Sequence, residues 1–504
     1  MHTPSGSHEG RQIEYNREVS AAGSPTKHAR LRVVWTFVLA ATILLLTAGR
    51  SAFAPSANAH YLEVAAGWLD GRLALEGDPP GYCSTEARRA GRCRHHQHDD
   101  WAQVWTLKLA DGQIVRGQPC VRDECRAVRR EGKEAWLDVT GRRLDLERSQ
   151  IVERSSTWYV SFPPGPAALL LPFVALWGLA TWDVLLTLLA AALIPALIVG
   201  RLDRSRGVRS EHLWLAAAWT FATPAWFVGA HGSVWFTAQI FGALGSWIYI
   251  LHADEDGAEL RAGTGLALAM ACRPHLAFAA LYFVTMRGLS TARAPALVRF
   301  GIPLVVVGSM MAALNYARFD QIFEFGHRYL DVRWQHRMQT YGQFSLHYLA
   351  RNLQCAFALL PQLRGGWPPL AVSIHGSAVW LGSPWLLASL RPRTTDAGTS
   401  SDWSRRRALA LAATIVVLAV PALVYHNSGQ LQFSYRFALD WLPYAACALL
   451  WSGRATGRAW RALILVGALY QAMGAWYFAR DPGRVFVADP LGWPFEDEMK
   501  NPRG

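Results

Sequence analysis

The residues best placed to do chemistry in this sequence of 504 residues are charged side chains within or beside apolar stretches. Arg273 precedes Pro274 inside a long apolar stretch, and a charge at that depth in a membrane is costly and usually functional. A paired or snorkelling arginine is the structural alternative. Arg436 and Asp440 lie four positions apart, so on a helix they could pair with each other. The pattern predicts either an anion-binding site or an ion pair.

A second group of candidates lies in the polar run 93–100, Cys-Arg-His-His-Gln-His-Asp-Asp. Cysteine, histidine and aspartate are all competent metal ligands. Their spacing matches no standard zinc pattern, so the expectation is no metal site. A divalent metal stays the one cofactor that the sequence leaves open, and the weaker alternative ligands are His95, His96, His98 and Asp99.

Four of the seven cysteines lie in the same polar region, which favours disulfides in an oxidising compartment. We expect the pairs Cys83–Cys93 and Cys120–Cys125. Four cysteines allow three pairings, so the connectivity itself is not fixed by the sequence.

The elements that must position these residues are expected to be transmembrane helices. Hydrophobic residues make up 52% of the chain and charged residues 17%, below the ~25% of a typical soluble domain. Backbone in lipid must satisfy its own hydrogen bonds and therefore forms helices. Apolar blocks of suitable length lie near 31–48, 167–182, 184–200, 212–229, 233–251, 263–286, 299–315, 370–390, 407–425, 437–451 and 460–479. The pattern predicts an all-α polytopic membrane protein with about eleven crossings.

The orientation follows from the basic residues at the ends of the blocks. Lysine and arginine are enriched at 287–299, 391–407 and 452–461, which are expected to be cytoplasmic. The N-terminus is then cytoplasmic and the C-terminus extracytoplasmic, in a multi-pass protein of the inner (cytoplasmic) membrane. A signal peptide cleaved near Ala57-Asn58-Ala59 is the alternative for the first block.

Five regions follow from this topology. They are a disordered cytoplasmic tail (1–30), a first transmembrane helix (31–50), an extracytoplasmic loop (51–160), a multispanning domain (161–480) and an extracytoplasmic tail (481–504).

The loop 51–160 is expected to form a small β-containing domain. Residues 61–69 have apolar side chains at helical spacing and predict a helix on the membrane surface. Asp111-Gly112 separates two short β-type runs and is a strong hairpin signal. Thr140-Gly141 predicts a second hairpin in the same way.

The net charge of +13 does not indicate a nucleic-acid partner. The arginines lie mainly at the ends of apolar blocks, where they set orientation and meet anionic lipid. The bilayer is therefore the expected partner of the basic surface.

Several outer-face motifs in this order resemble a known group. The early loop helix, YVSFPPGPAALLLPF (159–173), ACRP (271–274), NYARF (315–319), FEFGHRY (323–329), YGQFSLHYLARNL (341–353) and QFSYRFALDWLP (432–443) resemble bacterial multispanning proteins of the GT-C glycosyltransferase superfamily. The resemblance covers most of residues 31–480 and implies a GT-C-like fold.

The resemblance also implies a function. Such enzymes move a sugar from a polyprenyl-phosphate donor to an acceptor, unknown here, at the extracytoplasmic face. An acid in the first loop activates the acceptor hydroxyl or positions a metal, and basic residues bind the donor phosphate. The implied acids are Asp100 and Glu63. The residues implied to bind the donor phosphate are Arg436, Arg273, Arg318 and Arg328. The implied substrate pocket contains Tyr435, His327, Glu324 and Tyr159.

The sequence departs from the superfamily at one point. An acidic pair usually follows the first crossing, but residues 56–61 contain no acid and Glu63 is the nearest carboxylate. A general base must lie within hydrogen-bond reach of its hydroxyl, and Asp100 can meet that requirement only if the loop folds back to the membrane. A solvated acidic turn is the alternative. Two other functions therefore stay open, a transporter or flippase of a lipid-linked precursor and a non-catalytic assembly protein.

Overall fold

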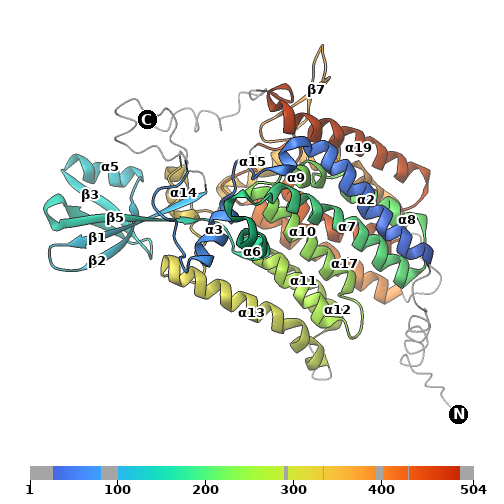
Figure 1. The fold of residues 1–504 in the computed structure, drawn as a ribbon, viewed down its shortest axis with the longest axis horizontal. Helices are drawn as coiled ribbons and strands as arrows, with labels where there is room; N and C mark the ends of the chain where they lie inside the picture. The colour runs from blue at the N-terminus through green and yellow to red at the C-terminus, as the bar shows by residue number, and fades with distance from the viewer. Residues whose placement is uncertain are drawn as a thin grey trace.

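A helix bundle with a small antiparallel sheet at one end forms the described part of the chain (Figure 1). The computed structural model describes residues 27–80, 100–288, 293–332, 334–392, 401–429 and 431–487. Most of the expected cytoplasmic tail (1–30) and most of the C-terminal tail lie outside these ranges. The last four residues of that tail, 27–30, are helical and begin α2, so the tail was predicted four residues too long.

The α-helices are α2 (Lys27–Ala48), α3 (His60–Leu69), α5 (Asp123–Arg130), α6 (Gly165–Trp177), α7 (Asp183–Arg206), α8 (Ser210–Phe221), α9 (Ala225–His231), α10 (Val234–His252), α11 (Glu259–Cys272), α12 (Ala280–Arg287), α13 (Ala294–Phe319), α14 (Gln335–Tyr341), α15 (Leu349–Phe357), α16 (Val379–Gly382), α17 (Ser401–Leu423), α18 (Leu442–Trp451) and α19 (Gly457–Arg480). Short 3-10 helices include η1 (Gly49–Phe53), η4 (Pro274–Ala279), η6 (His327–Tyr329), η8 (Pro384–Leu390) and η9 (Arg436–Asp440). The strands are β1 (Trp101–Leu109), β2 (Ile114–Pro119), β3 (Lys133–Asp138), β4 (Arg143–Glu147), β5 (Ile151–Val160), β6 (Gln362–Leu363), β7 (Leu370–Ser373) and β8 (Phe486–Val487).

The apolar helices show that the protein is membrane-embedded. Within the described ranges, five helices are long and apolar enough to cross a membrane: α2 with η1, α7, α10, α13 and the part of α17 from Ser404. A sixth crossing is present if α8 and α9, bent by 60° at their break, form one span. Only 11% of the apolar window of α13 is buried, so this helix presents an apolar surface that suits lipid.

The expected fold of about eleven crossings is therefore wrong. The block 263–286 forms α11, η4 and α12 in succession, because Pro274 interrupts helical hydrogen bonding. The block 370–390 forms β7, α16 and η8, and 437–451 yields only the ten-residue helix α18 after η9. A helix rises 1.5 Å per residue, so ten residues cover roughly half of a ~30 Å hydrocarbon core. Apolar composition alone did not reveal these breaks.

The main sheet has the strand order β4-β3-β2-β1-β5, and every neighbouring pair is antiparallel. The hairpin predicted at Asp111-Gly112 joins β1 to β2, and the one predicted at Thr140-Gly141 joins β3 to β4, so both are confirmed. Gly112 and Gly141 have positive φ, the conformation that favours glycine in such turns. The helix predicted at 61–69 is also confirmed, as α3.

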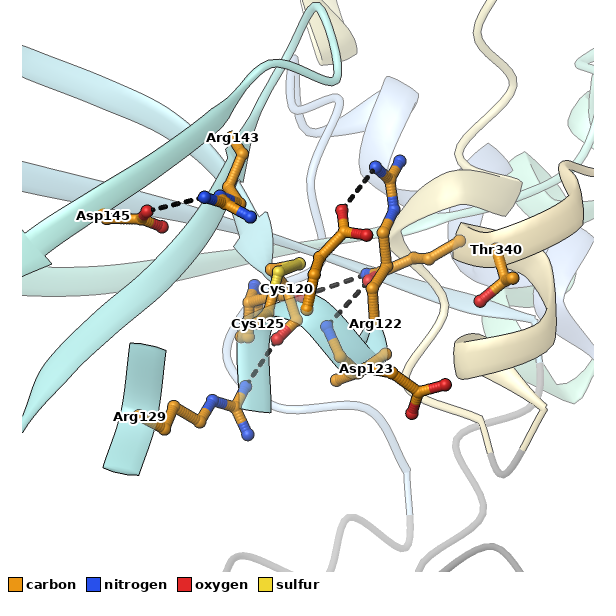
Figure 2. The surroundings of a disulfide bond; sticks show 12 residues. Cys120, Arg122, Asp123, Cys125, Arg129, Arg143, Asp145 and Thr340 are labelled. Atoms are coloured by element: carbon orange, nitrogen blue, oxygen red, sulfur yellow. Dashed lines mark hydrogen bonds and ion pairs between the residues drawn. A yellow bond between two sulfur atoms is a disulfide. The ribbon is translucent and has the colours of Figure 1, made fainter. Parts of the chain in front are cut away.

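A disulfide closes the connection between β2 and α5, which confirms the expected Cys120–Cys125 pair (Figure 2). The backbone N–H of Val121 donates to Oε1 of Gln339 on α14 at 2.7 Å, and Nε2 of Gln339 donates to the Pro119 carbonyl at 3.0 Å. The disulfide loop is therefore docked on α14, which lies between the sheet and the bundle (Figure 1). The other expected pair, Cys83–Cys93, lies outside the described residues.

We expect tryptic cleavage after Arg122 to leave two peptides that stay joined through Cys120–Cys125 until a reductant is added. Mass spectrometry of reduced and non-reduced digests checks this. Replacing both cysteines by serine is expected to lower the opening free energy of the β2–β3 region by about 2 kcal/mol, because the crosslink limits the unfolded chain. Hydrogen-exchange mass spectrometry of residues 114–138 measures that change.

The matched control is Cys447→Ala, which changes a buried cysteine of α18 in the bundle. It is expected to leave exchange in the sheet unchanged. Peptides that separate without reductant would contradict the disulfide assignment.

Candidate functional site

A cavity of about 1150 Å³ lies at the end of the bundle that faces the sheet. Its wall combines the segment after α2 (51–58), the start of β1, the break between α11 and η4, the segment 322–330 and the end of α17 with the residues that follow it. Ligand pockets are typically concave, mostly apolar and equipped with a few polar groups that fix orientation. The cavity has that composition, and four of the residues predicted as site residues line it: Asp100, Arg273, His327 and Arg436.

Asp440 holds two cationic or potentially cationic side chains at the cavity wall. Nε and Nη2 of Arg273 donate to the two carboxylate oxygens of Asp440, both at 2.7 Å, and Nε2 of His275 lies 2.9 Å from Oδ2. Asp440 is only 2% exposed. Burial acts to raise the pKa of its carboxyl, but Arg273 and His275 outweigh burial and hold the pKa at about 2. Asp440 is therefore ionised at neutral pH and neutralises Arg273.

The contacts of Asp440 show which arginine forms the ion pair that the sequence predicted. The pair expected four apart on a helix, Arg436 with Asp440, does not form, because η9 is a 3-10 helix and Asp440 bonds to Arg273 instead. Arg273 is the paired arginine of the structural alternative, and two of its three nitrogens are occupied by Asp440.

Arg436 is a buried cation without a carboxylate contact. It is 6% exposed, its Nη1 donates to Oε1 of Gln239 at 3.1 Å, and its Nε has no hydrogen-bond partner. Among the described residues Arg436 forms no ion pair. Burial, aided by Arg273, lowers the pKa of Arg436 to about 10, and Asp100 and Asp440 oppose that shift. The guanidinium stays charged at neutral pH, so this part of the cavity is prepared for an anion.

The first residues of the sheet bring Asp100 to the same cavity. Asp100 has φ 73°, and its carbonyl accepts a 3.0 Å hydrogen bond from the Ser161 N–H. That bond continues the antiparallel register of β1 and β5, in which Trp101 faces Val160. The side chain of Asp100 is 5% exposed and lines the cavity. The loop thus folds back to the bundle, and the solvated acidic turn is excluded.

Two further histidines line the cavity, His327 on η6 and His426 after α17. Burial lowers the pKa of His327 to about 4 and lowers the pKa of His426 well below its usual value. Both rings are therefore neutral at physiological pH. Gly326, with φ 96°, precedes His327 where an added Cβ would meet the Phe319 ring at 2.8 Å, so glycine is required there.

Three of the other predicted charged residues lie outside the cavity and have local partners. Arg318 is buried and donates to the Val160 carbonyl at 3.3 Å and to Oδ1 of Asn315 at 2.9 Å. Arg328 is exposed and pairs with Glu324 at 3.5 Å. These contacts give Arg318, Arg328 and Glu324 structural roles outside the cavity.

The remaining predicted residues are also outside the cavity wall. Glu63 is on α3, where partial burial raises the pKa of its carboxyl and Arg72 opposes the rise. Tyr159 is on β5 and packs edge-to-face against Phe319, with ring centroids 5.3 Å apart. Tyr435 is fully buried just before η9. None of these three side chains borders the space that Asp100 and Arg436 share.

Metal ligands do not gather among the residues that the structure describes. No group of three or more histidine, cysteine, aspartate or glutamate side chains in those ranges is arranged to hold an ion. The weaker alternative ligands His95, His96, His98 and Asp99 lie outside the described ranges.

Sequence reasoning missed three polar residues at or behind this wall. His275 follows Arg273 by two positions within the segment that interrupts the apolar block, and that proximity was the available signal. His426 and Gln239 carried no comparable signal, because one lies in a polar turn and the other in a long apolar helix.

Comparisons with known proteins assign the chain to no family. No family model, no curated protein and no solved structure matches the chain.

Asp440→Asn is expected to lower the free energy of unfolding by about 3 kcal/mol, because it leaves the partly buried Arg273 without a countercharge. The wild-type carboxyl has a pKa of about 2 against 3.8 unfolded. It therefore contributes about 2 kcal/mol that is present above about pH 4 and lost as the pH falls toward 2. Urea unfolding in detergent at several pH values measures both effects.

The control is Glu324→Gln, which removes a partly exposed ion pair and is expected to cost less than about 1 kcal/mol. An Asp440→Asn protein with wild-type stability, or with an unchanged loss of stability in acid, would contradict the assigned role of this ion pair.

Proposed function

We propose that this protein is a membrane glycosyltransferase that moves a sugar from a polyprenyl-phosphate donor to the hydroxyl of an acceptor at the extracytoplasmic face. One observation carries the proposal. The carboxylate of Asp100 and the guanidinium of Arg436 line the same cavity, at the end of a set of apolar helices, although they are 336 positions apart in the chain. A carboxylate from the first loop beside a buried cation is the arrangement that the reaction requires.

The donor phosphate is assigned to Arg436. This cation has no ion-pair partner among the described residues, so an incoming phosphate does not have to displace a carboxylate. Arginine binds phosphate oxygens through charge-assisted hydrogen bonds, which are stronger in a buried site than in water. Arg273 has Nε and Nη2 committed to Asp440, whose charge balances its own. Arg273 therefore stabilises the cavity wall and does not bind the phosphate directly.

Asp100 is assigned as the general base. In the transfer step, the acceptor oxygen forms a bond to the anomeric carbon while the bond from that carbon to the phosphate oxygen breaks. The proton of the acceptor hydroxyl passes to the Asp100 carboxylate. The electron pair leaves on the polyprenyl phosphate, whose increased negative charge is stabilised by Arg436.

The proposed location is the inner (cytoplasmic) membrane, with the sheet and the cavity on the extracytoplasmic side. The disulfide Cys120–Cys125 in the sheet supports this side, because disulfides persist in oxidising compartments. The start of α2, with Lys27, Arg30 and Arg32, lies at the opposite end of the bundle from the sheet (Figure 1). Basic residues at that end are expected on the cytoplasmic side. The bilayer and the lipid-linked donor are the proposed partners.

The test uses detergent-purified full-length protein and undecaprenyl phosphate carrying a pentose or a hexose. Arg436→Gln is expected to weaken binding by about 30-fold or more, because it removes the buried charge that contacts the phosphate. Asp100→Asn is expected to keep binding and to lower transfer to added acceptor lipid or peptide by about 100-fold or more. Binding is measured by intrinsic tryptophan fluorescence and transfer by mass spectrometry.

Two matched controls accompany these variants. Arg328→Gln removes an exposed arginine outside the cavity, and Glu63→Gln removes the other candidate acid; both are expected to bind and transfer as wild type does. Wild-type protein that binds none of the donors would overturn the proposal. Wild-type protein could instead bind the donor but transfer no sugar, with Asp100→Asn changing neither property. That result would favour the transporter or the non-catalytic assembly protein.

A further inference from the structure

His426 has an exceptional position in the cavity wall. It is 2% exposed, it lines the cavity, and neither ring nitrogen has a hydrogen-bond partner among the residues that the structure describes. Buried polar side chains in folded proteins are almost always hydrogen-bonded, and an unmade bond is costly. A ligand that occupies the cavity is the natural source of the missing partners.

Several hydrogen bonds hold the backbone of His426, so its ring has a defined position in the cavity wall. Its carbonyl accepts hydrogen bonds from Nη2 of Arg351 at 2.7 Å and from Nη2 of Arg337 at 3.1 Å. Its backbone N–H donates to the Gln343 carbonyl at 2.9 Å. Asn352 donates to the preceding carbonyl, that of Tyr425, at 2.7 Å. The side chains that surround the backbone thus fix the residue while leaving the ring itself without a bond.

The protonation state of the ring selects the kind of group that it can bind. Burial, together with His327, Arg337 and Arg351, keeps the pKa of His426 well below its usual value, so the ring is neutral. A neutral imidazole has one N–H donor and one acceptor nitrogen. A hydroxyl group both donates and accepts, whereas a phosphate or carboxylate oxygen only accepts. The ring therefore matches hydroxyl groups better than it matches the anion assigned to Arg436.

We propose that His426 binds hydroxyl groups of the sugar carried by the lipid donor and makes the site prefer a sugar-bearing lipid over the bare lipid phosphate. This proposal rests on the function proposed above for the identity of the ligand. Tyr425 and Phe437, which also line the cavity, provide apolar faces beside the polar contact, as in other small-molecule sites. His426 is a binding residue here and takes no part in bond breaking.

The experiment compares undecaprenyl phosphate with and without an attached pentose or hexose, using the full chain in detergent. His426→Phe removes both ring nitrogens and leaves the backbone contacts in place. It is expected to weaken binding of the sugar-bearing lipid by about 10-fold and to leave binding of the bare lipid phosphate unchanged. His426→Gln keeps a donor and an acceptor and is expected to recover most of the loss. His336→Phe, an exposed histidine outside the cavity, is the matched control.

Equal effects of His426→Phe on both lipids, or no effect on either, would overturn the inference. Wild-type protein that binds neither lipid would instead overturn the proposed function. In that event, methyl pentosides and methyl hexosides are tested for protection of His426 against diethyl pyrocarbonate, with modification followed by peptide mass spectrometry. Protection at His426 and not at His336 would support sugar binding by this residue, and no protection would overturn it.

Discussion

The buried carboxylate of Asp440 is the constraint on which the cavity depends. A buried charge is tolerated only with a partner, and Asp440 takes its partners from Arg273 and His275 at the break between α11 and η4. Pro274 makes that break, since it cannot continue the hydrogen bonding of α11 and it favours an extended residue before it. The same ion pair determines the role of Arg436. With Asp440 engaged elsewhere, Arg436 bonds to the neutral amide of Gln239 and forms no ion pair within the described part of the chain.

The sheet positions the acidic residue of the cavity, Asp100. The pairing of β1 with β5 ends at Trp101 and Val160, and the bond from Ser161 to the Asp100 carbonyl extends it by one residue toward the bundle. Docking of the disulfide loop on α14 through Gln339 keeps the sheet against the helices. The same helix carries Arg337, which contacts the carbonyl of His426. The positions of Asp100 and His426 are therefore connected through α14, so the sheet contributes to the structure of the cavity.

Local signals in the sequence predicted the local features well. Asp111-Gly112 and Thr140-Gly141 predicted both hairpins because turns with positive φ have strong residue preferences. The count of crossings was wrong because apolar blocks were treated as continuous, whereas tertiary contacts stabilise breaks such as the one at Arg273 and Pro274. The placement of Asp100 in the same cavity as Arg436 depended on strand register across a long loop. Nothing in the local pattern distinguished His426 from a histidine in an ordinary turn.

The charges in the cavity indicate why its residues divide into separate roles. Arg273 is neutralised by direct contact with Asp440, so its contribution is to fix the wall. Arg436 is not neutralised by contact, and burial makes its remaining charge strong toward an anion. His327 and His426 add no charge at neutral pH and therefore do not compete with Arg436 for a phosphate. A ligand with one anionic end and one hydroxyl-bearing end satisfies both kinds of group at once, and a sugar joined to a lipid phosphate is such a ligand.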